Sequence, residues 1–259
     1  TRDGAWDKYN GVDINRNYPF KWGETSKWTS SNPSSVYYMG PKAASEPEIQ
    51  AVMSLSKKEK FVLSLTFHTA ATKILTPYTI PGAKNPTPEI ARKYADVLAQ
   101  FAETGRSDRP KYKVAKNLYA VSGTDQDWHF FHNGTIALLV EGPYYHTSIN
   151  YKGAKNVISK FIPGLWRWIE YFENSPKLQI RTLDRNKKPI KTLAEIEDWS
   201  YFQGEEFYTD DKYGVHLFPL TKTGLLNLKV TRNPGTEFEK IEKRSINIKG
   251  GFNKIDIIF

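Results

Sequence analysis

The pattern of apolar residues changes once along the chain, just after Asn174. Before this point, apolar residues at helical spacing alternate with short apolar runs of strand length, which is the pattern of an α/β fold. After it, short strand-like segments are separated by turns rich in Asn, Gly and Pro, which is typical of an antiparallel β-sandwich. The sequence therefore predicts two domains, residues 1–175 and 176–259.

Capping residues and periodicity predict the elements of each part. In the first part, helices should begin near Ser45, Thr87, Thr124 and Ala154, and strands should span residues 60–67 and 135–140. Pro163-Gly164 should kink or interrupt the last helix, and residues 106–117 should form a loop. In the second part, we predict strands over residues 178–183, 214–218, 225–231, 246–248 and 253–259.

Composition narrows the classes of function. The chain has 259 residues and no cysteine, which excludes disulfides, cysteine-ligated zinc fingers, iron–sulfur clusters and a cysteine nucleophile. No apolar run reaches the roughly eighteen residues that suggest a membrane span, so we expect none. The net charge of +9 is spread over both parts without a dense basic run. This favours a solvated basic surface over binding of nucleic acid or another acidic polymer.

Most catalytic motifs are absent. The five histidines include no HExxH pair, and no GxGxxG, GxxxxGK[ST] or GxSxG segment occurs. Three groups of residues remain, of which the first is Asn15-Arg16-Asn17. A guanidinium beside an amide suits bidentate capture of a carboxylate. The alternative is a loop held together by its own hydrogen bonds.

The other two groups lie at the ends of apolar strands. His68 follows the first predicted strand, at the kind of strand end where open α/β sheets build sites; a purely structural His is the alternative. Glu141 follows the second predicted strand, after a loop that contains Tyr119. A carboxylate directly after a buried strand is costly unless it is paired or has a function. The alternative interpretation is structural, with Glu141 as a strand cap held by a salt bridge.

Together these groups resemble the zinc metallocarboxypeptidases of the funnelin type, which include the carboxypeptidase A/B and N/E relatives (peptidase family M14). In that family, a D-x-N-R-N segment is followed by a strand-end His ligand and by a Tyr-x-x-Ser/Pro-Gly loop. A catalytic Glu lies 22 residues after the Tyr, the same separation as between Tyr119 and Glu141. The resemblance covers about residues 10–173 and implies a mixed central sheet flanked by helices. The tail after Pro176 resembles the transthyretin-like domain of the N/E branch.

The resemblance implies a role for five residues. Asn15 and Arg16 would bind the C-terminal carboxylate of a peptide, and Tyr119 would close over it as a mobile lid. His68 would be a ligand of one zinc ion, which lowers the pKa of bound water to about 7. Glu141 would be the general base that takes a proton from this water and returns it to the leaving amine. The implied function is zinc-dependent hydrolysis of the C-terminal peptide bond of peptides or proteins.

The resemblance also implies a specificity position at Gln126. This residue is neither acidic nor plainly apolar, so we expect release of a neutral C-terminal residue. Lys116 would favour an acidic residue if it pointed inward. By resemblance, the same pocket would be lined by Val114, Leu118, Val121 and Leu139.

The sequence departs from the family in its metal ligands. The family takes two further zinc ligands from an H-x-x-E segment upstream of D-x-N-R-N, and no His here is followed by Glu at position +3. Arg2 lies too near the first residue to be assigned as the oxyanion-stabilising Arg. Because catalytic zinc needs three protein ligands, we expect an N-terminally incomplete catalytic domain, inactive alone. The two ligands would precede Thr1, either on a separate N-terminal fragment or beyond the sequenced part; loss of catalysis is the alternative.

Three functions stay open. The first is a zinc metallocarboxypeptidase whose partner is a peptide or protein C-terminus. The second is a non-catalytic relative that uses Asn15 and Arg16 to bind peptides, and the third is a cell-wall peptide hydrolase on the same scaffold. Family members are commonly exported, so the resemblance implies a secreted or periplasmic location.

Overall fold

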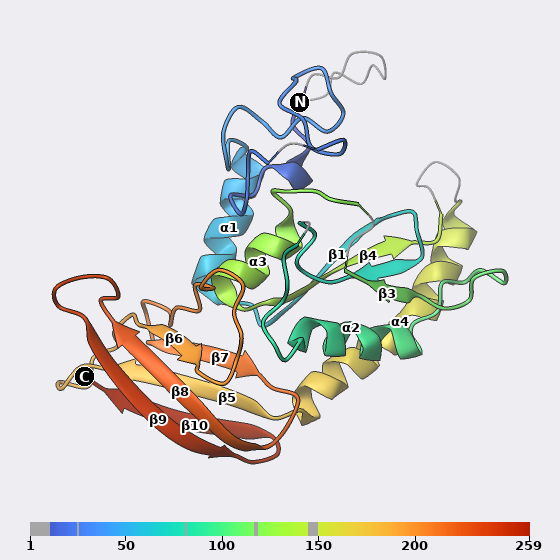
Figure 1. Ribbon diagram of the computed structural model, residues 1–259. Helices are drawn as coiled ribbons and strands as arrows, with labels where there is room; N and C mark the ends of the chain where they lie inside the picture. The colour runs from blue at the N-terminus through green and yellow to red at the C-terminus, as the bar shows by residue number, and fades with distance from the viewer. Residues whose placement is uncertain (1–10, 25, 81, 117–118, 145–149) are drawn as a thin grey trace.

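The computed structural model describes residues 11–24, 26–80, 82–116, 119–144 and 150–259 (Figure 1). Its first part contains the 3-10 helix η1 (Ile14–Arg16) and the helices α1 (Pro47–Glu59), α2 (Ile90–Phe101), α3 (Asp125–Asn133) and α4 (Tyr151–Asn174). The strands of this part are β1 (Leu63–Thr69), β2 (Lys73–Leu75), β3 (Lys113–Ala115) and β4 (Ile136–Gly142). The predicted helices and strands are present. β2 and β3 are additional, because strands of three residues are too short to show a period, and β3 lies within the predicted loop 106–117.

The four strands form one mixed sheet in the order β1-β4-β2-β3. β1 runs parallel to β4, while β2 runs antiparallel to β4 and parallel to β3. The central strand β4 is buried from Ile136 to Val140, as expected of a strand covered on both faces. β1 is an edge strand whose Phe67 is 62% exposed. Because β1 and β4 are parallel, their carboxyl ends meet at the same edge of the sheet.

The helices pack in pairs beside this sheet (Figure 1). α2 packs against α4, where the rings of Tyr94 and Tyr171 meet edge to face with centroids 5.0 Å apart. α1 lies beside α3, and Ser56 Oγ is hydrogen-bonded to His129 Nδ1 at 3.0 Å. One apolar core, which includes the buried Trp128, lies between the helices and the strands. Packing in this core fixes the positions of the strand ends.

The proline in α4 does not interrupt the helix, contrary to expectation. α4 is continuous from Tyr151 to Asn174 with Pro163 inside it. The next residue, Gly164, packs so closely that an added Cβ would lie 2.5 Å from Ala102, and the Lys160 carbonyl accepts a hydrogen bond from Glu103 N at 3.0 Å. Contacts with the end of α2 therefore support the helix where the proline removes a donor.

The second part contains two three-stranded sheets, in the orders β10-β5-β7 and β6-β8-β9. Their strands are β5 (Lys177–Leu183), β6 (Leu193–Ile196), β7 (Val215–Pro219), β8 (Gly224–Arg232), β9 (Lys240–Ile248) and β10 (Phe252–Ile258). Both sheets contribute to one apolar core, which includes Leu178, Ile180, Ala194, Ile196, Phe218, Leu228 and Val230. The division into domains at residue 175 stays a prediction.

Two details of the second part differ from the sequence-based expectation. β5 and β10 pair in parallel, whereas we expected antiparallel strands throughout. β9 is nine residues long, whereas we expected a strand only over residues 246–248. Its first six residues are mostly charged and show no apolar alternation, so the sequence did not indicate that they belong to the strand. Pairing with β8 along its whole length, rather than apolar alternation, determines its extent.

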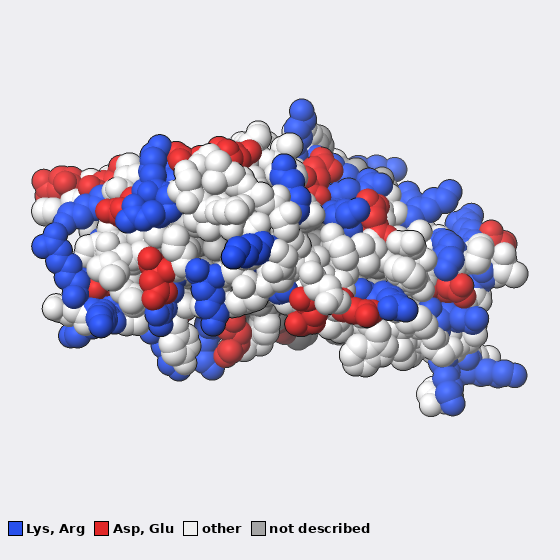
Figure 2. Space-filling model, turned by 90° about the horizontal axis from the view of Figure 1, so that it is seen from below, with Lys and Arg blue, Asp and Glu red and all other residues white. Residues whose placement is uncertain are grey.

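Charges of both signs are mixed on the surface. On the face seen in Figure 2, Asp and Glu side chains lie among the Lys and Arg side chains. In the second part, salt bridges join Lys229 to Glu195 at 2.9 Å and Lys243 to Glu197 at 2.5 Å. Such mixing dilutes the field of the excess positive charge. Within the described ranges, no helix is both long and apolar enough to cross a membrane.

Candidate active site

A small pocket at the carboxyl ends of β1 and β4 brings all six predicted site residues together. Its cavity has a volume of about 40 Å³, which is room for one or two water molecules. The predicted residues among its lining are Asn15, Arg16, His68, Tyr119, Gln126 and Glu141. In the sequence these residues span 126 positions, so their meeting is a product of the fold.

Arg16 is held at the base of this pocket by the backbone around it. η1 is capped by Asp13, whose Oδ1 accepts a hydrogen bond from Asn15 N at 3.1 Å. The Arg16 guanidinium donates from Nε to Trp28 O at 2.6 Å and from Nη1 to Asn15 O at 2.7 Å. These bonds use two of its five N–H groups, so the buried cation keeps donors for a ligand.

Asn17 has a structural role in the same segment. Its Nδ2 donates to Met39 O, Lys42 O and Ser45 Oγ over 2.8–3.1 Å. Its Oδ1 accepts a hydrogen bond from Glu46 N, at the start of α1, at 3.1 Å. The Asn-Arg-Asn segment thus combines both interpretations of the sequence, because Asn17 fixes the loop while Asn15 and Arg16 line the pocket.

His68 and Glu141 are neighbours across the two parallel strands. They occupy the same register position of β1 and β4, and residues opposite each other in a sheet point to the same face. Glu141 is buried, and burial raises the pKa of its carboxyl. His68 and Arg16 lie close enough that their charge acts in the opposite direction and lowers this pKa. These nearby charges offset part of the effect of burial on the carboxylate.

The start of α3 fixes the pocket from a second side. Asn15 Oδ1 accepts a hydrogen bond from Asp125 N at 3.0 Å, and Thr66 Oγ1 donates to Asp125 Oδ2. Gly123 passes so close to η1 that an added Cβ would lie 2.3 Å from Arg16 O. With φ at +68°, Gly123 also has a backbone conformation that other residues rarely adopt. A glycine at this position therefore allows the loop before α3 to pack against Arg16.

Gln126 lines the pocket, and the next residue, Asp127, anchors this part of α3. Asp127 accepts hydrogen bonds from Thr79 N at 2.9 and 3.1 Å and from Thr79 Oγ1 at 2.6 Å, which ties α3 to the chain after β2. Burial raises the pKa of Asp127 to about 7, against the opposing effect of the bonds from Thr79. Gln126 is buried, and its Oε1 has no hydrogen-bond partner among the described residues. A buried acceptor without a partner is available to a ligand.

Tyr119 lies over the pocket near Arg16. Its ring stacks on Trp28 with centroids 4.6 Å apart, and it is 36% exposed. Burial raises the pKa of its hydroxyl, while the adjacent Arg16 guanidinium lowers it. The side chain thus closes the cavity without being locked into the core.

The lining of the pocket differs in part from the sequence prediction. Val121 and Leu139 line it as expected, and Leu118 and Arg2 lie outside the described residues. Val114 is not part of the lining, because it lies on β3 and packs against the apolar core. Lys116 does not reach the pocket either. Three further lining residues, Leu75, Thr79 and Thr124, were not predicted from the sequence. Only Thr124 had a signal in the sequence, because Thr124-Asp125 indicated the start of α3.

The described residues do not make up a complete metal centre. Zinc sites take three or four ligands from His, Cys, Asp or Glu, and no group of three such side chains that could hold a metal occurs in the described ranges. His68 offers one imidazole, with Glu141 beside it on the next strand. This set fits one part of a catalytic zinc site, and further ligands are needed to hold the ion.

Comparison with known proteins identifies the family. Residues 1–160 match the model of the zinc carboxypeptidase family, Peptidase_M14, over more than half of the chain. The chain belongs to the zinc carboxypeptidase family.

Individual relatives are similar over a shorter stretch. Human carboxypeptidase A6 is 33% identical over 123 residues, and human carboxypeptidase O is 35% identical over 127 residues. Each alignment covers 46% of this zinc carboxypeptidase chain, but only 28% and 32% of the relatives. The chain thus spans about a third or less of the length of these relatives.

Solved structures of family members share the fold. Carboxypeptidase A from Helicoverpa armigera superposes with a TM-score of 0.52 and 22% identity, covering 66% of this chain and 43% of that one. Bovine thrombin-activatable fibrinolysis inhibitor, solved in complex with tick carboxypeptidase inhibitor, superposes with a TM-score of 0.54 and 20% identity. That match covers 62% of this chain and 56% of the bovine one. At these identities the likeness supports the mixed α/β fold.

Proposed function

We propose that this chain carries the substrate-carboxylate site, one metal ligand and the general base of a zinc-dependent carboxypeptidase. The observation that carries the proposal is the convergence of Arg16, His68 and Glu141 on one pocket at parallel strand ends. A cation for a carboxylate, an imidazole and a buried carboxylate are the groups that hydrolysis of a C-terminal peptide bond requires. The substrate is the C-terminus of a peptide or protein.

Arg16 and Asn15 bind the terminal carboxylate of the substrate. Beyond the bonds to Trp28 and Asn15, the guanidinium has three further N–H groups, and Tyr119 is hydrogen-bonded to this side of it. A planar fork of this kind pairs well with a carboxylate. Its position is preset by those two bonds, so little side-chain entropy is lost on binding. A substrate carboxylate on Arg16 leaves the scissile bond on the side of His68 and Glu141.

Glu141 transfers the protons of the reaction. Its carboxylate takes a proton from the attacking water and passes it to the nitrogen of the leaving amine, which is a poor leaving group until protonated. Burial raises the pKa of Glu141, which strengthens it as a base. The nearby Arg16 guanidinium acts in the opposite direction and lowers this pKa, which favours the ionised form that the first of these steps needs.

Tyr119 acts as the lid. A cavity of about 40 Å³ is too small for a peptide residue, so a side chain has to move when the substrate enters. Tyr119 is exposed, whereas Asn15 and His68 are half-buried and the other lining residues are buried, and its ring is held by its stack on Trp28. After the substrate is bound, its hydroxyl can return to the carboxylate on Arg16.

Gln126 sets the preference for a neutral C-terminal residue. Its uncharged amide lies among Leu75, Val121 and Leu139 in the lining. Because no carboxylate other than Glu141 lines this pocket in the described structure, a basic substrate side chain would find no partner beside Gln126. A polar or apolar neutral side chain fits this wall.

The remaining zinc ligands come from a further polypeptide segment that docks on β1. β1 carries His68 and has no partner on its outer edge among the described strands. Phe67 is exposed and meets Phe161 of α4, and α4 exposes Ile158 and Trp166 on one face. An open edge strand beside apolar surface is a template for another strand. We infer that the N-terminal fragment with the H-x-x-E pair adds to this edge.

The second part is proposed as a transthyretin-like domain that supports the catalytic part, and a secreted or periplasmic location follows from the family. A non-catalytic peptide-binding relative is the second candidate function. The incomplete metal set in the described ranges favours it, since Arg16 alone suffices to bind a carboxylate.

Zinc content and peptidase activity of the longest natural form of the polypeptide distinguish these functions. We expect one zinc ion per chain and release of neutral C-terminal residues from N-acylated dipeptides, both lost in His68→Gln. His132→Gln is the matched control, because His132 pairs with Glu206 away from the pocket, and it should keep both. A polypeptide that binds peptide C-termini but retains no zinc would support the second candidate instead.

A further inference from the structure

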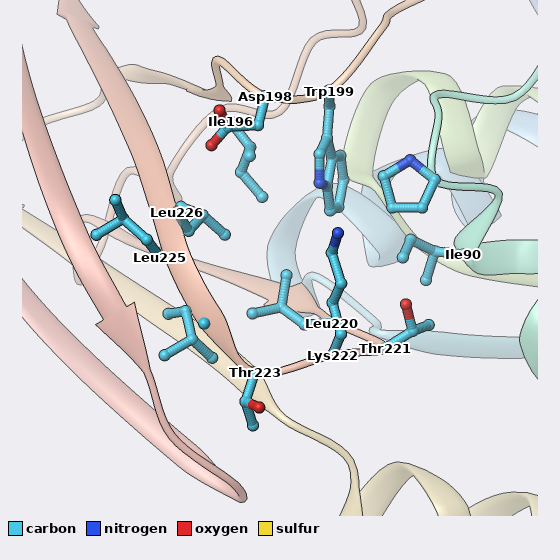
Figure 3. A pocket seen from close by; sticks show the side chains of 13 residues that line it. Ile90, Ile196, Asp198, Trp199, Leu220, Thr221, Lys222, Thr223, Leu225 and Leu226 are labelled. Carbon is cyan, nitrogen blue, oxygen red and sulfur yellow. The ribbon is translucent and has the colours of Figure 1, made fainter.

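A larger cavity lies where the two parts of the molecule meet (Figure 3). Its volume is about 280 Å³, against about 40 Å³ for the catalytic pocket. Pro88 and Ile90 line it from the start of α2, and its other walls come from the ends of β6 and β9 and from the connection between β7 and β8. None of its lining residues takes part in the function proposed above.

The walls of this cavity combine apolar and polar surface. Ile196, Leu220 and Leu226 are buried side chains on its apolar side, and the indole of Trp199 projects into it (Figure 3). An apolar ligand body gains free energy by displacing water from this apolar side. The flat face of Trp199 suits a ring.

A positive charge points into the cavity. The Lys222 ammonium group is directed toward Trp199 (Figure 3), and Lys222 forms no ion pair with a described residue. The acidic member of the lining, Asp198, already accepts hydrogen bonds from Asn227 N at 2.8 Å and from Asn227 Nδ2 at 3.2 Å. Its charge is thus engaged by β8, while that of Lys222 is available to a ligand.

The start of α2 forms one wall of the cavity. Ile90, the first residue of this twelve-residue helix, lines it, and the preceding residue is the exposed Glu89. The positive charge that faces the cavity is therefore that of Lys222. Together with the apolar side, it makes this cavity complementary to an anion attached to an apolar body.

We propose that this cavity binds a small carboxylic acid with a single aromatic ring. The ring lies against Trp199 between Ile196 and Leu226, and the carboxylate meets the Lys222 ammonium group. Thr221 and Thr223 flank Lys222 on the same connection and line the cavity as well. The volume is at the lower end of the range for ligand cavities, which restricts the ligand to about this size.

Such a ligand would strengthen the junction of the two parts. Beside the cavity, Thr87 and Ser200 exchange two backbone hydrogen bonds, of 2.9 and 3.1 Å, and so join the parts directly. A ligand between Ile90 on one side and Leu226 on the other contacts both parts at once. Because it binds only when they are together, it shifts the equilibrium toward the joined state.

The test is titration of the full chain with 3-phenylpropionate, followed by calorimetry and ligand-detected NMR. We expect saturable binding with a Kd of about 1 mM or tighter and a rise in the thermal midpoint. Lys222→Gln should weaken binding of the acid about tenfold or more and leave binding of uncharged 3-phenylpropanol unchanged. The matched control is Lys254→Gln on β10, an exposed lysine outside the cavity, which should change neither.

A second variant checks the location. Thr223→Trp fills the mouth of the cavity without altering the core, and should abolish binding of both compounds. Because Arg16 also suits a carboxylate, the titration is repeated with Arg16→Lys, where binding should persist. Absence of saturable binding, equal binding by Lys222→Gln, or loss of binding only in Arg16→Lys would each overturn the proposal. The measurement needs neither zinc nor a further segment, so it stands apart from the catalytic function.

Discussion

The catalytic pocket and the core of the second part treat buried polar groups differently. In the pocket, Gln126 Oε1 is buried without a hydrogen-bond partner among the described residues, as is Oδ1 of the neighbouring Asp125. In the second part, the hydroxyl groups of Thr182, Thr192 and Thr209 lie within 3.2–3.4 Å of one another and form a shared network. The pocket thus keeps an unused acceptor, whereas this threonine cluster is satisfied internally, although His216 Nε2 and Thr231 Oγ1 elsewhere in the second part are also buried without a described partner.

The difference between the pocket and the threonine cluster favours binding at the first and stability at the second. An unpaired buried acceptor or a buried carboxylate destabilises the fold, and a ligand that supplied the partner would offset this cost. A satisfied network in an apolar core adds rigidity. Substitutions in the pocket should therefore alter function more than stability, and substitutions in the second core should do the reverse.

The largest effect is expected for Glu141→Gln. In the complete enzyme, loss of the proton-transferring carboxylate should lower kcat by about 10²–10⁴-fold, or about 3–5 kcal/mol in the barrier. The free energy of unfolding should be unchanged or higher, because a buried carboxylate with a raised pKa is replaced by a neutral isostere. Steady-state kinetics and urea unfolding check both parts. Turnover equal to that of the unmodified enzyme would show that Glu141 is not the base.

Leu228→Ala tests the other region of the comparison, the core of the second part. Leu228 is fully buried on β8, and its truncation should lower the free energy of unfolding by about 2–5 kcal/mol. Leu225→Ala on the same strand is the control, since Leu225 is 72% exposed and should cost about 0.5 kcal/mol or less. Both variants should bind a substrate-like carboxylate at Arg16 normally while folded. Loss of that binding in folded Leu228→Ala would mean that the two regions are coupled.

Gly123→Ala separates backbone strain from contact with the site. The added Cβ would lie 2.3 Å from Arg16 O, and we expect a loss of about 2–4 kcal/mol in stability from the overlap together with the positive φ. Gly204→Ala is a matched control with nearly the same φ, +69° against +68°, and open space around it. It should lose about 1–2 kcal/mol. Equal losses in the free energy of unfolding of the two variants, measured by heat or urea, would show that the contact with Arg16 does not contribute to stability.

The last prediction is a pH dependence of stability in the second part. His216 is buried between Phe207 and Phe218, and burial lowers its pKa to about 3 from an ordinary value of 6.5. The unfolded chain therefore binds a proton below about pH 6.5 that the folded chain does not bind. Stability from this group is intact above pH 6.5 and is lost as the pH falls toward 3, by up to about 1.4 kcal/mol per pH unit.

His216→Phe should flatten this slope. Urea unfolding between pH 4.5 and 7.5 measures it, and the value at pH 7.5 controls for the altered packing of the variant. A slope equal to that of the unmodified chain would assign the acid sensitivity to other groups, such as His129 of α3, whose pKa is also lowered by burial.

Local sequence predicted the elements whose periodicity is long and the site residues that follow them. β4 could be expected from its unbroken apolar run, and the position of Glu141 at its end followed directly. β2 and β3 could not be expected, because three residues contain no period and their pairing is with each other and with β4. For the same reason Thr79 was missed, since its place in the pocket depends on the bond to Asp127, 48 residues away.

By itself, the sequence determined which chemical groups are available, at what spacing, and that the pattern divides after Asn174. Those properties are local, and they sufficed for the resemblance to the zinc carboxypeptidases. Only the tertiary structure decided that Asn15, Arg16 and His68 meet Glu141 in one pocket, that Val114 lies outside it, and that a second cavity opens at the junction of the parts. Pairing of parallel strands and close packing act between residues far apart in the chain, and no local period encodes them.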